Sequence, residues 1–425
     1  MTMPLWQPWS LRQLVADLTE GRTTPESAVE RSRTRIAATE EELAAWVTTE
    51  PDGAAPPAAG PLAGVPFGVK DIIDVARYPT RCGSALRAHA GPAEADAAIV
   101  TAWRGTGVAV VGKTVTTEFA FFSPGPTRNP VAPGHTPGGS SSGSAASVAS
   151  GQVPLAIGSQ TAGSVTRPAA YCGVASLVMT RGRFPVDGVF GLSPSLDAHG
   201  VYAAGAADLA VAWHALSRTR TPSDRDPARP PRVLLWSAEP LGVVGTPMKQ
   251  ALDIARTRMT AAGAEVTAFP LERLIGHLTA AHPVIMAYEA ARERAAELAV
   301  ADRLSEPLAH LVRTGAATSA DEYQAAQDTV AAARTRVAEL FASYDVVVGP
   351  AAPGAAPAGL DATGDPVLSR SWQVLGLPVV TVPGLRDTAG LPLGIQVIGA
   401  ANDEARLLAR STWIEAALAP ERNPA

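Results

Sequence analysis

Three short segments of this chain hold residue types suited to nucleophilic catalysis. Lys70 ends an apolar segment, a Gly/Ser-rich loop spans 137–146, and a Gly-flanked turn at 158–168 follows another apolar segment. A serine hydroxyl is a weak nucleophile until a base removes its proton. Lysine serves as that base when burial lowers its pKa, because an apolar site disfavours the ammonium. The pattern is compatible with serine chemistry and a lysine base; the alternatives are that Lys70 is a surface cation and that the Gly/Ser segment is an ordinary loop.

The turn at 158–168 offers a place for the negative charge that such chemistry creates. Successive backbone N–H groups in this turn can converge on one oxygen, as an oxyanion hole requires. They belong to Thr161, Ala162, Gly163 and Ser164. The small side chains at 162 and 163 let a carbonyl approach closely. With Ser164 at the end of the turn, nucleophile and oxyanion donors come from one short segment.

Residues 107–114 match the phosphate-binding loop pattern letter for letter, but we reject the match. That loop needs flexible residues whose N–H groups wrap a phosphate. Here the intervening residues, Val108–Val111, form an apolar run that predicts a strand. Lys113 is then expected to be an ordinary lysine at a strand end.

The segment 139–143 fits the nucleophile-elbow pattern, which would make Ser141 the nucleophile. That mechanism needs an acid and then a histidine base downstream, and no downstream histidine stands in a distinguishing motif. We expect the histidines to be surface, core or turn residues; they are His89, His135, His199, His214, His277, His282 and His310. No His/Asp/Glu cluster has metal-ligand spacing, so no metal site is expected.

The composition narrows the function classes further. Hydrophobic residues make up 46% of the 425 residues and charged ones 18%, which permits a large core and excludes global disorder. The formal net charge of −5, without a basic stripe, argues against nucleic acid as a partner. Two cysteines, Cys82 and Cys172, are too few for a disulfide framework, so we expect a cytoplasmic chain. Without a signal peptide or a long apolar run, no membrane association is expected.

The elements that position these segments alternate between helices and short apolar strands, which predicts one large α/β domain with a mixed central sheet covered by helices. We expect caps at Ser10 and at Thr24, before Pro25. Strands are expected at 65–69, 108–111, 153–157, 232–236, 264–269, 345–348, 379–382 and 393–397, and helices at 94–104, 144–150, 206–217 and 403–418. The predicted parts of the domain (1–425) are a helical pair (8–50), a catalytic core (60–218), a linker (219–232), a helix-rich insertion (233–343) and C-terminal strands and a helix (344–420) that rejoin the core.

Three motifs, in this order, resemble those of the amidase signature family. They are GVPFGVKD at 64–71, PGGSSSGSAA at 137–146 and QTAGSVTRPAA at 160–170. The resemblance covers most of the chain, and extends to 180–183, 192–197 and 390–397. Within the family the chain looks closest to the short malonamidase-like members, on the segments 167–173 and 363–366.

The resemblance implies a Ser–Ser–Lys triad, in which Ser164 is the nucleophile, Ser140 the bridging serine and Lys70 the base. It also implies a cis peptide bond before Ser140 and a guanidinium at Arg167 that faces a carboxylate of the substrate. The alternative for Arg167 is a structural tie from its loop to a carboxylate or to backbone carbonyls. The implied activity is hydrolysis of a small linear carboxamide through an acyl-enzyme, without a cofactor, by a homodimer.

Other functions stay open on the sequence alone. One is an amidotransferase A-type subunit of a tRNA-dependent transamidosome, although such family members are typically longer and this chain has no extra basic segment for tRNA. The other is a scaffold without catalysis, which the intact triad argues against. The chain departs from the family pattern at Gln160, Ala162, 178–179 and His199. None of these positions belongs to the triad, so the departures bear on substrate specificity.

Overall fold

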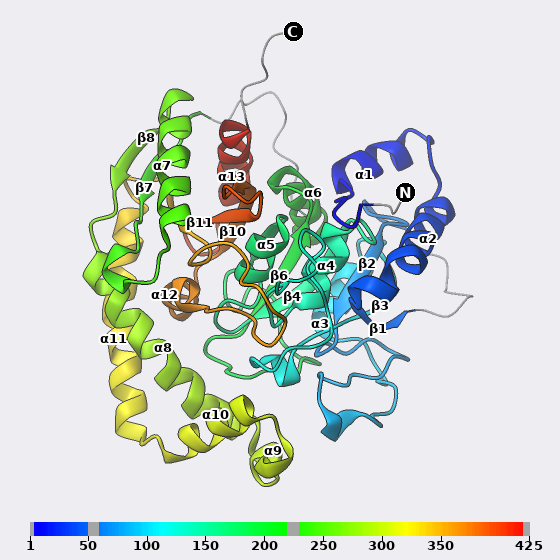
Figure 1. Cartoon of the computed structure of the whole chain (residues 1–425), viewed down its shortest axis with the longest axis horizontal. Helices are drawn as coiled ribbons and strands as arrows, with labels where there is room; N and C mark the ends of the chain where they lie inside the picture. The colour runs from blue at the N-terminus through cyan, green and yellow to red at the C-terminus, as the bar shows by residue number, and fades with distance from the viewer. Residues whose placement is uncertain (1–3, 50–58, 219–228, 420–425) are drawn as a thin grey trace.

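One mixed β-sheet crosses the molecule and is covered by helices (Figure 1). The computed structural model describes residues 4–49, 59–218 and 229–419. The strands are β1 (Trp46–Thr49), β2 (Pro66–Lys70), β3 (Ala109–Thr114), β4 (Leu155–Gln160), β5 (Ala175–Val178), β6 (Ala198–Ala203), β7 (Arg232–Leu235), β8 (Glu265–Ala268), β9 (Val346–Pro350), β10 (Val379–Arg386) and β11 (Pro392–Ile398). Within the described residues these eleven strands form one sheet in the order β1-β3-β2-β4-β6-β5-β10-β11-β9-β7-β8.

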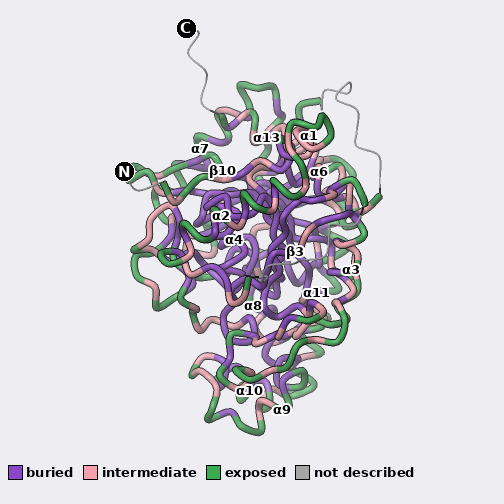
Figure 2. The backbone as a smooth tube through the Cα atoms, turned by 90° about the vertical axis from the view of Figure 1, so that its right-hand side faces the viewer, coloured by how far each residue is buried: buried purple, intermediate pink, exposed green. Residues whose placement is uncertain are grey.

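The helices surround the sheet, and the buried backbone gathers in the middle of the molecule (Figure 2). They are α1 (Leu11–Thr19), α2 (Pro25–Leu43), α3 (Ala98–Arg104), α4 (Ser142–Ala149), α5 (Thr166–Cys172), α6 (Ala206–Ser217), α7 (Thr246–Ala261), α8 (Glu272–Glu293), α9 (Ala295–Leu298), α10 (Glu306–Ala317), α11 (Ala320–Leu340), α12 (Val367–Leu375) and α13 (Glu404–Leu418). Helices α10 and α11 both pack on α8 at the lower left of Figure 1. No helix of the described chain is long and apolar enough to cross a membrane.

The strand directions determine which chain segments come together at the site. β3, β2 and β4 are neighbours and run parallel, whereas β4, β6, β5, β10, β11 and β9 pair antiparallel in turn. Every residue of β2 and β4 is buried, as expected for parallel strands covered on both faces. The carboxyl ends of β2 and β4 therefore meet at one edge of the sheet, where the loops that follow them come together.

The α/β architecture predicted from the sequence is confirmed, and so are the first two helix caps. Ser10 Oγ accepts from the N–H of Gln13, and Thr24 Oγ1 accepts from that of Ser27, both at 3.2 Å. The expected helical pair over 8–50 is too long, because α2 ends before Ala44, which has a left-handed φ of 48°. The chain then turns into the edge strand β1, which pairs with β3.

The later parts of the chain also differ from the sequence-based boundaries. Most of the expected linker, 219–228, lies outside the described residues. The strands expected at 232–236 and 264–269 are β7 and β8, and they extend the same sheet through β9. The C-terminal strands β10 and β11 link the two halves of that sheet, since β10 pairs with β5 and β11 with β9. The sequence analysis did not predict β5, β6, α5 or α12.

Candidate active site

Lys70 is the last residue of β2, and the sheet sets what lies beside it. β2 and β4 run parallel with Val69 opposite Ile157, so Lys70 comes next to the end of β4. Its Nζ lies 2.7 Å from Ser140 Oγ and 2.9 Å from Ser159 Oγ. Sequence reasoning missed Ser159, whose only distinguishing signal is its place one residue before the end of β4.

Burial governs the charge of Lys70. The side chain is fully buried, and loss of hydration lowers its pKa from 10.5 to about 7, against the attraction of the buried Asp197 carboxylate. In the described part of the chain its hydrogen-bond partners are the two hydroxyls and the carbonyl of Ser159, at 3.4 Å, and no carboxylate forms an ion pair with it. A substantial fraction of Lys70 is therefore neutral near pH 7 and able to accept a proton from Ser140.

Ser140 is presented by the Gly/Ser loop just before α4 begins. The Gly139–Ser140 peptide bond is cis, as the resemblance implied. The Ser140 carbonyl accepts from the N–H of Thr117 at 3.2 Å, and the Gly139 carbonyl accepts from Arg167 Nη2 at 2.7 Å. Glycine is required at 139, because a Cβ there would lie 2.8 Å from a methyl carbon of Thr363. These contacts hold the Ser140 hydroxyl in line with Lys70.

The two motifs rejected from the sequence occupy structural positions. Ser141 is fully buried, and its hydroxyl donates to the carbonyl of Ser159 at 3.3 Å, so it does not face the cavity described below. Residues 109–114 form strand β3 as predicted, which leaves no loop to wrap a phosphate.

The backbone N–H groups of residues 161–164 are free. None of them donates to another group of the described protein, whereas those of Val165 and Thr166 both donate to Gln160 Oε1, at 2.9 and 3.0 Å. The amide group of Gln160 is in turn held by Gln373, with 3.0 Å from Nε2 to Oε1. Although Gln160 departs from the family's usual Asp, it thus keeps an acceptor oxygen under the turn. Four free N–H groups, including that of Ser164 itself, are the arrangement that an oxyanion hole requires.

Two side chains that sequence reasoning did not place in the site, Asp197 and the buried His282, fix Thr161. Its hydroxyl donates to Asp197, and its carbonyl accepts from His282 Nε2 at 2.8 Å. The Thr161 carbonyl and the Ala162 N–H belong to one trans peptide group, in which C=O and N–H point in opposite directions. The hydrogen bond from His282 to this carbonyl therefore turns the N–H of Ala162 away from His282. Burial lowers the pKa of His282 to about 4, so the ring is neutral. His282 lies on α8, 121 residues from Thr161, and no local pattern marked it.

A cavity with about 370 Å³ of empty space lies over this turn. Ser140, Ser164 and Arg167 line it, and so does the predicted oxyanion segment, Thr161, Ala162 and Gly163. The rest of the wall consists of Ala120, Phe121, Phe122, Leu192, Met286, Pro366 and Arg370. The structure therefore brings the sequence-predicted residues to one place, with Lys70 behind Ser140.

The backbone is strained in the segment that forms one wall of the cavity. Phe119, Ala120 and Phe122 have φ angles of 43°, 62° and 31°, in the left-handed region that residues with a Cβ rarely adopt. Such conformations cluster at functional sites, where the surrounding structure holds them in place. Here they turn the rings of Phe121 and Phe122 toward the space beside Arg167.

Arg167 enters the wall from α5 with only part of its guanidinium engaged. Its Nη2 donates to Gly139 O at 2.7 Å and to Thr363 Oγ1 at 3.2 Å. Its buried Nε and Nη1 have no hydrogen-bond partner among the described residues. Burial lowers the pKa of Arg167 to about 10, so it remains a cation at neutral pH. Arg167 thus holds the loop of Ser140 in place through Nη2, while its Nε and Nη1 remain free donors.

Beneath the site, a buried ion pair joins the strand ends. Lys113, at the end of β3, lies 3.0 Å from the carboxylate of Asp71, and both side chains are fully buried. Lys113 Nζ also contacts Thr80 Oγ1 at 2.9 Å. Burial raises the pKa of Asp71 and lowers that of Lys113, while each partner's charge opposes the shift. Lys113 is therefore not an ordinary strand-end lysine but a structural partner of the residue that follows Lys70.

We expect Lys113→Met to lower the free energy of unfolding by about 3–5 kcal/mol, because it leaves the Asp71 carboxylate buried without a cation. The matched control is Lys249→Met, which removes a half-exposed lysine 3.5 Å from Glu239. This control should cost no more than about 0.5 kcal/mol. Denaturant unfolding of both variants measures the difference. Equal losses in the free energy of unfolding would show that the buried pair matters no more for stability than an exposed one.

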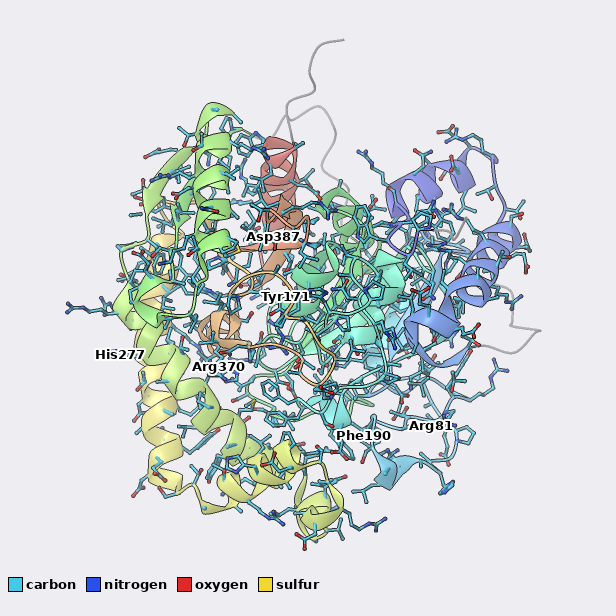
Figure 3. All side chains as sticks on the ribbon, viewed as in Figure 1. Arg81, Tyr171, Phe190, His277, Arg370 and Asp387 are labelled. Carbon is cyan, nitrogen blue, oxygen red and sulfur yellow. The ribbon has the colours of Figure 1, made fainter. Side chains whose placement is uncertain are left out.

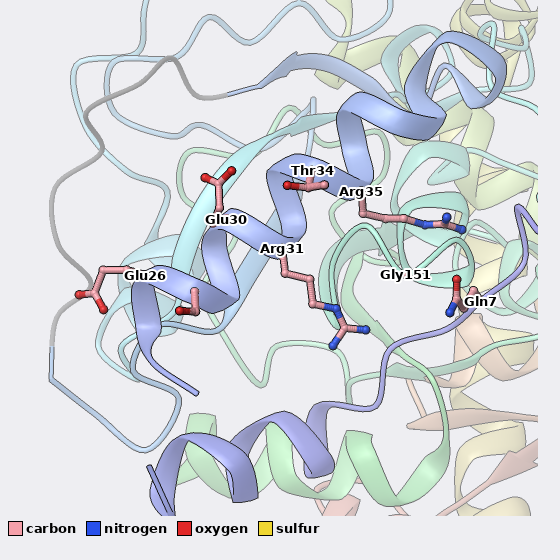
Figure 4. Close-up of a pocket in the computed structure, with 8 residues that line it drawn as sticks. Gln7, Glu26, Glu30, Arg31, Thr34, Arg35 and Gly151 are labelled. Atoms are coloured by element: carbon pink, nitrogen blue, oxygen red, sulfur yellow. The ribbon is translucent and has the colours of Figure 1, made fainter. Parts of the chain in front are cut away.

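A larger and more open hollow lies away from this chemistry, beside α2 (Figure 4). Its wall includes Gln7, Glu26, Arg31, Arg35 and Gly151. The two arginines are engaged in the fold, since Arg35 donates to the carbonyl of Ser150 at 2.8 Å and Arg31 stacks on a tryptophan. None of the predicted site residues lines this hollow.

Comparison with known proteins agrees with these observations. The family model described as Amidase matches residues 28–408. AtzE, the 1-carboxybiuret hydrolase component of Pseudomonas sp. (strain ADP), is 33% identical over 387 residues, which cover 82% of either chain. A glutamyl-tRNA(Gln) amidotransferase component of Lachnospira eligens is 30% identical over 453 residues, which cover 91% of this chain and 93% of the relative.

A solved structure described as "An unexpected vestigial protein complex reveals the evolutionary origins of an s-triazine catabolic enzyme" superposes with a TM-score of 0.87 and 27% identity. It covers 98% of this chain and 100% of that one. The closer likeness to malonamidase-like members stays a prediction. The match to the family model spans most of the sequence, including all three motifs. The chain therefore belongs to the amidase family, enzymes that hydrolyse the C–N bonds of amides.

Proposed function

We propose that this enzyme hydrolyses a small linear carboxamide through a Ser164–Ser140–Lys70 triad and an acyl-enzyme. The observation that carries the proposal is the contact of 2.7 Å between Lys70 Nζ and Ser140 Oγ in a buried site, beside a turn with free N–H groups. A lysine with a pKa of about 7 is a competent base at neutral pH. Because no histidine lines the cavity within the described residues, Lys70 is the base that the site offers.

The reaction follows from this arrangement. Neutral Lys70 takes the proton of Ser140, and Ser140 takes that of Ser164 as its oxygen attacks the amide carbon. The negative charge on the carbonyl oxygen is stabilised by the N–H groups of residues 161–164. The relay then returns the proton to the leaving nitrogen, which departs as ammonia or an amine. Water attacks the acyl-enzyme by the same relay and releases the carboxylate, which restores Ser164.

The substrate we propose is a short amide that carries a free carboxylate. The buried Nε and Nη1 of Arg167 are unpartnered donors at the cavity, and guanidinium groups bind carboxylates in bidentate fashion. The name of one relative, a 1-carboxybiuret hydrolase component, indicates a carboxylated substrate for that protein, in line with this choice.

Ammonia release from a panel of small amides tests the proposal. The panel pairs half-amides of short dicarboxylic acids with neutral amides of similar size. The purified chain should release ammonia from some of the half-amides and should react with a fluorophosphonate at Ser164, as peptide mass spectrometry can show. Modification of a different serine would contradict the assignment of the nucleophile.

For Arg167 we expect two separable losses on substitution by alanine. Removing its bond to Gly139 loosens the loop of Ser140, so hydrolysis of every amide should fall. Removing its free donors should lower kcat/KM for a carboxylated amide by a further ten- to hundredfold, the size of one charge-assisted contact. The measurement is the ratio of kcat/KM for the carboxylated and the neutral amide, in wild type and variant. An unchanged ratio with a lowered melting temperature would make Arg167 purely structural.

The amidotransferase A-type function is the alternative, since a relative from a glutamyl-tRNA(Gln) amidotransferase aligns over most of both chains. In that case the chain would need companion proteins for activity, and glutamine would be its ammonia source. Hydrolysis of half-amides by the purified chain alone favours the amidohydrolase. Activity on glutamine that appears only with added partner proteins favours the amidotransferase.

A further inference from the structure

The charged side chains that line the cavity in the described chain are all positive. Two arginines line it, Arg167 from α5 and Arg370 from α12, and no carboxylate does so in the described chain. Figure 3 shows Arg370 at α12, beside α8 and away from the triad motifs in the sequence. The sequence analysis gave Arg370 no role and did not predict the helix α12 that carries it.

Arg370 has no structural partner that explains its position. Its Nε is buried without a hydrogen bond, and its guanidinium forms no hydrogen bond or ion pair with any residue that the structure describes. Other arginines of this region are tied to the backbone: Arg181 donates to the carbonyl of Ser195, and Arg334 donates to that of Val374 at 3.3 Å. Because buried polar groups are normally paired, the free Nε of Arg370 is available to a partner from outside the chain.

The two guanidinium groups also interact unfavourably. The charge of Arg370 adds to burial in lowering the pKa of Arg167. Tyr171, Asp365 and Tyr202 act in the other direction, and each has a larger effect than Arg370, although the Asp365 carboxylate is exposed and already accepts from the N–H of Val367 at 2.9 Å. An anion in the cavity would offset this repulsion and satisfy the free donors of Arg167 and Arg370 together.

We propose that Arg370 is the second arm of a carboxylate clamp. The free carboxylate of a short half-amide binds between Arg167 and Arg370, while its amide carbonyl reaches the N–H groups beside Ser164. The inference rests on the proposed function and specifies its substrate class, half-amides of short dicarboxylic acids. The acid must be short, because its carboxylate lies at Arg167 and Arg370 while its amide end lies at the turn of Ser164, and all of these residues line one cavity.

The kinetic test compares succinamate with 4-methylpentanamide, in which an isopropyl group replaces the carboxylate. Arg370→Gln should lower kcat/KM for succinamate ten- to hundredfold, mainly through KM, and change that for the neutral amide less than about threefold. Arg370→Lys should restore part of the loss, since it keeps the charge without the planar fork. The matched control Arg336→Gln, at an exposed arginine on α11, should change neither substrate. Equal losses on both substrates, or none, would overturn the clamp.

A binding test separates the clamp from the proposed catalysis. Malonate or succinate should raise the melting temperature of the wild-type protein, and Arg370→Gln should remove most of this shift while Arg336→Gln preserves it. If the wild type hydrolyses no amide but shows this Arg370-dependent binding, the clamp stands and the proposed function fails. If it hydrolyses half-amides with no role for Arg370, the proposed function stands and the clamp fails. No binding of either dicarboxylate to the wild type would also overturn the clamp.

Discussion

Replacement of Ser164 by alanine should abolish amide hydrolysis, lowering kcat by several orders of magnitude, while the fold survives. The loss is that large because, in the proposed mechanism, this hydroxyl forms the acyl-enzyme. The fold survives because the backbone of Ser164 keeps its bonds: its carbonyl accepts from Ser141 N at 3.3 Å and from Tyr202 Oη at 3.2 Å. Single-turnover and steady-state ammonia release measure the effect, and the melting temperature reports the fold.

Ser141→Ala is the matched control for this experiment. Ser141 belongs to the same buried group of serines, but its hydroxyl bonds to the backbone of Ser159 and does not line the cavity. We expect this variant to retain turnover within about tenfold of wild type, the range of a lost structural hydrogen bond. If Ser164→Ala kept more than about a hundredth of wild-type turnover while Ser141→Ala lost it, the nucleophile would be Ser141.

The second large effect concerns Lys70 and the pH dependence of catalysis. The base must be neutral, and burial lowers the pKa of Lys70 to about 7. Below that pH Lys70 is an ammonium and cannot take the proton of Ser140; above it the amine is free. We therefore expect kcat/KM to rise with a slope of one on a logarithmic scale up to about pH 7, and then to level off. A pH series on the wild type measures the profile.

Lys70→Ala should lower kcat/KM by a factor of about 10²–10⁴, the usual contribution of a positioned base, and should remove the step near pH 7. Lys249→Ala is the control, since Lys249 is a half-exposed lysine on α7. It should leave rate and profile unchanged. If Lys70→Ala hydrolysed amides as fast as wild type with the same profile, another group would have to be the base.

Several features of this protein follow from local sequence chemistry. Thr24 before Pro25 starts α2 because the side chain caps the helix and proline fits its first turn. The apolar runs that became β2, β3 and β4 were recognisable because parallel strands buried on both faces need continuous hydrophobic residues. The Gly-flanked turn at 158–168 was recognisable because few residue types allow a carbonyl to approach the backbone. These signals, with the motif resemblance, gave the family and the expected triad.

Elements with mixed local signals escaped prediction. β6 contains His199 and Gly200 among its apolar residues, and its neighbour β5 is only four residues long. α5 carries Pro168, which is typical of a turn but is also tolerated in the first turn of a helix. Pairing with neighbouring strands and packing against the sheet decided these elements, and such contacts are absent from a local window of sequence.

The site itself depended on the tertiary structure. Lys70 and Ser140 meet because the loop before α4 bonds to the end of β4, from Ser141 to Ser159, and β4 is adjacent and parallel to β2, which no spacing in the chain specifies. His282 on α8 and Arg370 on α12 reach the cavity region from distant segments, and no local pattern marked either residue. The sequence determined which groups are able to react. Only the folded chain decided their charge and their partners, because a pKa and a hydrogen bond depend on what burial removes and on what packing places within 3 Å.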